Sequence, residues 1–177
     1  AVWDVKTRQK IESLGDSDVN KQDLGIAVAF GPKGKLAALP GPNNTIIIQS
    51  IIGNRNVMKL SGIKLFSKRI VFSPDGRRIA ACDHRQIVLW ELANPSQPQI
   101  IRAGKCVVWN LLFSPDGKFL FTGEGTFVVV REAATGLELI RLQGAERMEA
   151  LAVSPDGRSV ATGGSTAITS WDLETKR

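Results

Sequence analysis

The sequence contains few of the histidine and cysteine side chains that nucleophilic catalysis commonly uses. His84 is the only histidine, and it directly follows Asp83 in a segment that we expect to form a turn. A Ser–His–Asp or Cys–His centre needs a nucleophile, a base and an orienting group that converge in space. Nothing in the sequence marks such a nucleophile. We therefore predict that the protein is not an enzyme and that it has no catalytic residue.

Metal and phosphate sites have equally little support. Cys82 and Cys106 lack CxxC spacing, and a single histidine cannot complete a zinc site with them. No GxxxxGK[ST] or GxGxxG phosphate loop precedes a helix. We therefore expect no metal and no cofactor. Reduced cysteines are typical of a reducing compartment, so we expect a cytoplasmic location, although a processed secreted chain would look the same.

The charge pattern bears on the class of partner. The formal net charge of +6 comes from lysines and arginines that recur singly in turns, such as Lys33, Arg77, Lys118 and Arg158. A nucleic-acid interface concentrates its cations on one face or one helix, so we expect no nucleic-acid partner. No apolar run approaches 18 residues, so we expect no membrane-spanning helix.

An internal repeat indicates the elements that position these residues. The tetrapeptide Ser-Pro-Asp-Gly begins at Ser73, Ser114 and Ser154, and a worn version begins at Gly31. Proline at the second position and glycine at the fourth are typical of a type I turn. A period of about 40 residues is typical of a solenoid or propeller.

Short apolar segments surround each turn and predict strands, with no helix. First strands are expected at 26–30, 69–72, 110–113 and 150–153, and second strands at 36–39, 78–81, 119–122 and 159–162. Third strands are expected at 45–49, 87–91, 127–132 and 167–172, and fourth strands near 57–60, 99–102 and 138–142. Residues 2–5 and 9–14 add a strand pair in front. The pattern therefore predicts an all-β protein built from four-stranded antiparallel units.

A fixed offset supports this alignment of the units. The residue 17 positions after the start of each turn is Ile48, Trp90, Arg131 or Trp171, and Trp171 is followed by Asp172. With four strands per unit and this Trp-Asp phrase, the chain resembles the WD-repeat family of β-propellers. The resemblance covers essentially the whole chain. It implies a partial blade at 1–25, blades at 26–68, 69–108 and 109–148, and a partial blade at 149–177.

The resemblance leaves the closure of the ring open. About four blades are present, and we favour a piece of a larger propeller with seven or eight blades. Two alternatives are pairing with a second copy of the chain and closure as four blades, with residues 9–14 as the missing outer strand. Remaining blades or a second copy are therefore expected partners, because an uncovered blade face would expose a large apolar surface.

The chain also departs from the family pattern. Typical WD repeats pin each blade with a network of Gly-His, an Asp in the turn before the third strand, a Ser or Thr, and the Trp. Gly104 and Gly144 are not followed by histidine, so this network cannot form in full. Arg131 occupies the tryptophan slot, and we expect its stem to pack while its guanidinium reaches the rim. A contact with a ligand or partner is the alternative role.

What the resemblance implies about function is a rigid scaffold that binds protein partners across the top face of the propeller. The positions expected at the top entrance are Ile26, Lys68, Trp109 and Glu149, and His84 and Arg85 lie in an adjacent top loop. We predict partner binding by Lys68, Trp109, Glu149, His84 and Arg85, because Trp and Arg are frequent hot spots. Trp109 has a structural alternative, which is to pack on its neighbouring blade. The alternative function is a propeller enzyme, or a small-molecule or metal binder, that uses the central channel.

Overall fold

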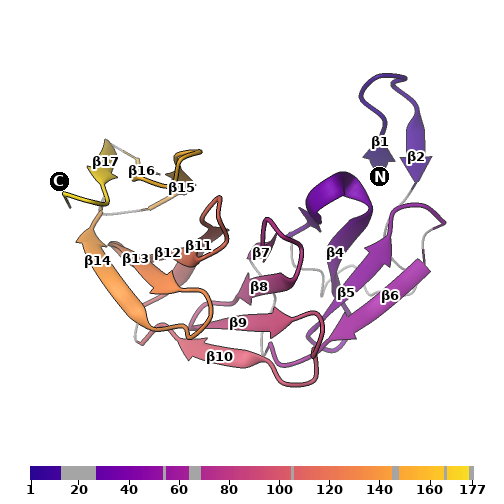
Figure 1. Ribbon diagram of the computed structural model, residues 1–177, viewed down its shortest axis with the longest axis horizontal. Helices are drawn as coiled ribbons and strands as arrows, with labels where there is room; N and C mark the ends of the chain where they lie inside the picture. The colour runs from indigo at the N-terminus through magenta and orange to yellow at the C-terminus, as the bar shows by residue number, and fades with distance from the viewer. Residues whose placement is uncertain are drawn as a thin grey trace.

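The computed structural model describes residues 1–12, 27–53, 55–63, 69–104, 106–144, 148–165 and 167–175. Antiparallel sheets follow one another along an open arc, like the blades of an incomplete propeller (Figure 1). The first strands of the blades, such as β7 and β11, lie on the concave side of the arc, and the fourth strands, such as β10 and β14, lie on the convex side. The predicted all-β class and the blade architecture are confirmed.

Each blade contains consecutive strands in chain order. The front pair is β1 (Val2–Trp3) and β2 (Lys10–Glu12). The first four-stranded blade contains β3 (Ala29–Phe30), β4 (Leu36–Gly41), β5 (Thr45–Ser50) and β6 (Arg55–Leu60). The second contains β7 (Arg69–Phe72), β8 (Arg78–Cys82), β9 (Gln86–Glu91) and β10 (Gln99–Arg102). The third contains β11 (Val108–Phe113), β12 (Phe119–Glu124), β13 (Phe127–Glu132) and β14 (Glu138–Gln143). The last sheet contains β15 (Ala150–Val153), β16 (Ser159–Gly163) and β17 (Ile168–Asp172).

The Ser-Pro-Asp-Gly turns have the same local chemistry at all three positions. In the first, the Ser73 hydroxyl accepts a hydrogen bond from the Arg78 amide at 2.9 Å and lies 2.6 Å from the Asp75 carboxylate. That hydroxyl is the largest cause of the lowered pKa of Asp75. Gly76 has a φ of 71°, which explains the glycine. The worn copy forms a short 3-10 turn, η1 (Pro32–Gly34), instead.

Apolar packing between neighbouring blades forms the core. Ile48 of β5 packs with Trp90 of β9 in a cluster shared by the first two four-stranded blades. Trp90 is fully buried, and its indole N–H donates to the Ser61 carbonyl of the preceding blade at 2.8 Å. Trp171 packs in the same manner against the cluster that contains Phe121. Trp90 and Trp171 thus face the preceding blade. The predicted equivalence of Ile48 is wrong by one position, because Gln49 is the residue in register with Trp90 and Ile48 faces the next blade.

The alternative in which the chain closes as four blades, with residues 9–14 as the outer strand of the last sheet, is wrong. Residues 10–12 pair with Val2 and Trp3 in a hairpin, so they do not serve as the outer strand of the last sheet. Within the described residues the last sheet has three strands, and β17 pairs with β16. Residues 13 and 14 of the predicted strand lie outside the described part of the chain.

The expected position of the Arg131 guanidinium at the rim is also wrong. The Arg131 side chain is 4% exposed and forms an ion pair with the fully buried Glu124. It also donates to the Thr122 hydroxyl at 2.9 Å, and that hydroxyl lies 2.7 Å from the Glu124 carboxylate. A charge in a buried slot requires such partners, because desolvation without them costs several kcal/mol. The third blade therefore has a polar network of Arg131, Glu124 and Thr122 in place of the network of typical WD repeats.

This network gives a stability prediction. Glu124→Gln leaves the buried Arg131 guanidinium without its main counter-charge, so we expect the free energy of unfolding to fall by about 3 kcal/mol. Urea unfolding followed by circular dichroism measures this difference, and Glu174→Gln on the exposed surface serves as the control. The double variant Glu124→Met/Arg131→Met removes both charges, so it should lose less stability than Glu124→Gln. Equal stability of Glu124→Gln and the control would contradict the network.

Candidate protein-binding site

The candidate residues gather at the end of the blades opposite the Ser-Pro-Asp-Gly turns. His84 and Arg85 form the turn between β8 and β9, Trp109 lies near the start of β11, and Glu149 directly precedes β15. These residues come from the second, third and last blades. Lys68 and Ile26, which were also predicted at this face, lie outside the described residues.

Asp83 holds the β8–β9 turn in one conformation. Its side chain is buried, and one carboxylate oxygen accepts the backbone amides of Arg85 at 2.8 Å and Gln86 at 3.0 Å. The Asp83 amide donates to the Gln86 carbonyl at 3.0 Å. A carboxylate that accepts local amides in this manner makes an Asx-type turn. The carboxylate next to His84 therefore supports the backbone and does not orient the imidazole for catalysis.

The turn is attached to the neighbouring strands on both sides. The His84 carbonyl accepts the Val108 amide of the next blade at 3.1 Å, and the Arg85 carbonyl accepts the Ala103 amide at 3.0 Å. The His84 and Trp109 rings meet edge to face, with centroids 6.4 Å apart and planes at 82°. Such an aromatic pair is a favourable geometry. The side chains of His84 and Trp109 are therefore held together across the boundary between two blades.

A β-bulge presents Trp109 at the surface. Val108 pairs with Glu124 and Asn110 pairs with Gly123, so Trp109 is the extra residue of β11. Val108 and Asn110 are buried, whereas Trp109 is 42% exposed. Bulges redirect a side chain out of the regular ladder. The predicted contact of Trp109 with the adjacent blade is present, and much of the ring surface is exposed; its role in partner binding stays a prediction.

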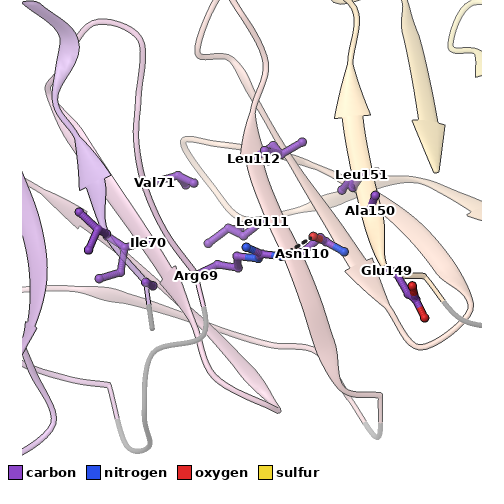
Figure 2. A pocket seen from close by; sticks show the side chains of 11 residues that line it. Arg69, Ile70, Val71, Asn110, Leu111, Leu112, Glu149, Ala150 and Leu151 are labelled. Atoms are coloured by element: carbon purple, nitrogen blue, oxygen red, sulfur yellow. Dashed lines mark hydrogen bonds between the residues drawn. The ribbon is translucent and has the colours of Figure 1, made fainter. Parts of the chain in front are cut away.

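A cavity of about 410 Å³ lies among the first strands on the concave side of the arc (Figure 2). Its polar lining side chains are Arg69, Asn110 and Glu149. The Arg69 guanidinium donates to the Asn110 side-chain carbonyl at 3.4 Å, a long hydrogen bond between two blades (Figure 2). Glu149 lies on the last blade, and its backbone amide donates to the Gly163 carbonyl at 2.9 Å. Glu149 was predicted from the sequence as a residue of this face, whereas Arg69 and Asn110 were not.

Two kinds of feature are absent from the described part of the chain. None of its His, Cys, Asp and Glu side chains form a group of three that could hold a metal ion. Among the same residues, no helix has the length and hydropathy needed to cross a membrane.

Comparison with known families identifies the repeats. A family model described as WD domain, G-beta repeat matches residues 55–91 and 97–129. The first match runs from the start of β6 to the end of β9, so one sequence repeat joins the outer strand of one blade to three strands of the next. No curated protein matches the sequence.

Two tryptophans should respond differently to truncation. Trp90→Ala removes a fully buried ring between two blades, so we expect a loss of about 3–5 kcal/mol in the free energy of unfolding. Trp109→Ala removes a ring that is 42% exposed, and we expect a loss of less than about 1 kcal/mol. Urea unfolding of the two variants measures both values. A large loss for Trp109→Ala would show that its role is mainly structural.

Proposed function

Because two segments of the chain match the WD-repeat family, we propose that it is a non-catalytic scaffold that binds a protein partner at the face formed by His84, Arg85 and Trp109. WD repeats generally mediate interactions between proteins. We refer to these three residues as the Trp109 face.

The outward position of Trp109 carries the proposal. A large ring that is 42% exposed, on a bulge and braced by His84, is an anchor with little conformational entropy to lose on binding. Arg85 adds the second residue type that is frequent in hot spots. The backbone of the His84–Arg85 turn is hydrogen-bonded to β10 and to the next blade, which supports a preorganised surface.

The cavity beside Arg69, Asn110 and Glu149 favours a second candidate, a small molecule bound in the channel. Polar side chains that converge on a concave site are typical of ligand sites. The Trp109 face remains the stronger candidate because Trp109 is larger than the side chains that line the cavity and is 42% exposed. Calorimetry with a metabolite library separates the two, since tight binding that is lost in Asn110→Ala but kept in Trp109→Ala would favour the channel.

Selection from a displayed peptide library tests the scaffold proposal. The 177-residue chain is the bait, and each selected peptide is measured against Trp109→Ala and against Trp3→Ala, which removes another exposed tryptophan. We expect peptides whose affinity falls at least about tenfold in Trp109→Ala and stays unchanged in Trp3→Ala. If no selected peptide depends on Trp109, the scaffold proposal at this face is wrong.

We also propose that further blades cover the outer faces of the terminal sheets. Val28 and Phe30 are exposed on either side of Ala29, which packs inward, and Ile168 of β17 is 84% exposed. Such apolar positions alternate along a strand when each of its faces packs on a neighbour. We also propose a cytoplasmic location, because two cysteines without CxxC spacing are typical of a protein from a reducing compartment.

Light scattering tests the uncovered faces. Since exposed apolar sheet faces favour association, we expect particles of the isolated chain to have a mass above the monomer mass of 19.2 kDa. The variant Phe30→Glu/Ile168→Glu should shift the particle toward that mass, and Lys33→Glu on an exposed turn serves as the control. A defined dimer would favour a second copy over further blades. A monodisperse wild-type monomer would contradict the proposal.

A further inference from the structure

The charges around Trp109 indicate the chemistry of the partner. Building on the scaffold function proposed above, we infer that the partner presents an acidic peptide segment to the Trp109 face. Its carboxylates bind Arg85 and Arg69, and an adjacent apolar side chain packs on the Trp109 ring. The inference concerns the class of ligand, so it can fail while the scaffold proposal stands.

Exposed cations lie on the second blade, which contacts the Trp109 ring through His84. Arg85 follows His84, whose carbonyl binds the Val108 amide next to Trp109. The Arg69 guanidinium reaches the side chain of Asn110, the residue that follows Trp109. Arg102, at the end of β10, is a further exposed cation next to Ala103, which hydrogen-bonds Arg85. Three cations of the second blade thus lie on the blade that contacts Trp109.

The nearby acidic groups are turned inward and already have partners. The Asp83 carboxylate accepts the amides of its own turn, and the fully buried Glu124 is paired with Arg131. These two carboxylates therefore do not offer binding groups to a partner. The opposite end of the blades differs, because each Ser-Pro-Asp-Gly turn combines an exposed aspartate with a basic residue, as in Asp116 and Lys118. The cations of these turns are therefore offset by an aspartate of the same turn.

Acidic peptide fits this arrangement better than nucleic acid. A guanidinium binds a carboxylate through two parallel hydrogen bonds, and an exposed indole binds an apolar side chain beside it. Nucleic acid is held by many phosphate contacts along a continuous basic track. Here a few cations lie on the blade that contacts a single ring, and Glu149 interrupts any track toward the last blade.

Glu149 marks the limit of the proposed site. It is the exposed carboxylate on the next blade, and it lines the same concave surface as Arg69. Like charges near an interface oppose binding. An acidic segment is therefore oriented from Trp109 toward Arg85, away from the last blade.

Fluorescence anisotropy with a defined probe tests the inference. The probe is a short fluorescein-labelled peptide in which glutamates flank a Leu-Phe pair, and the matched peptide carries glutamine in place of glutamate. We expect the acidic probe to bind and its affinity to fall about tenfold in Arg85→Glu and with rising salt. Glu149→Gln should tighten binding about twofold. Arg158→Glu, at the opposite end, is the control and should change nothing.

The variants should retain the fold, because only the backbone of Arg85 takes part in the hydrogen bonds that hold the turn. Circular dichroism and thermal unfolding check this for Arg85→Glu. The inference is wrong if the glutamine peptide binds as tightly as the acidic one, or if library peptides that depend on Trp109 are neutral or basic. It is also wrong if an oligothymidine strand displaces the probe and binds more tightly through Arg85. Failure to select any peptide that depends on Trp109 would instead contradict the scaffold proposal.

Discussion

Packing between the faces of neighbouring blades is the constraint on which the rest of this structure depends. Each sheet is too thin to bury its apolar side chains alone, and the buried clusters all contain residues from two adjacent blades. The fully buried Trp90 shows how strict the contact is, since its indole reaches the backbone of the preceding blade. The repeat sequence adds a covalent link, because each family match begins with the outer strand of one blade and continues into the next. The arc is therefore held by contacts between neighbours and needs no central core.

The same constraint creates the binding face. Packing two sheets together fixes the β8–β9 turn of one blade against the first strand of the next, and the hydrogen bond from Val108 to His84 is a direct result. Side chains that are more than 20 residues apart, such as His84 and Trp109, thereby share one surface. A preorganised surface of this kind loses little entropy on binding. Function at a blade boundary thus follows from the forces that stabilise the blades.

Features of the fold that recur in every repeat could be predicted from the sequence, and features found in one blade alone could not. The period, the turn residues and the alternation of apolar positions predicted the blades, and the strand ends shifted by only a few residues. Trp109 and Arg131 show where prediction stopped. The bulge at Trp109 is an irregularity of pairing that no periodic pattern contains, and the ion pair of Arg131 depends on Glu124, whose side chain is brought to it by the hairpin. The roles of Arg69 and Asn110 likewise depend on a contact between blades.

The residue types at the position of Trp90 in the different blades show which property of that position the fold requires. Gln49, Trp90 and Arg131 occupy equivalent positions in the strand pairing and are all buried, although one is polar, one aromatic and one charged. The slot therefore requires a filled volume, and it tolerates a charge only when the blade supplies buried partners such as Glu124 and Thr122. Positions at the ends of the strands carry no such requirement. Residues that depart from the repeat there, as Trp109 does on its bulge, are free to vary with the partner, so the recognition surface is best sought where the repeat is broken.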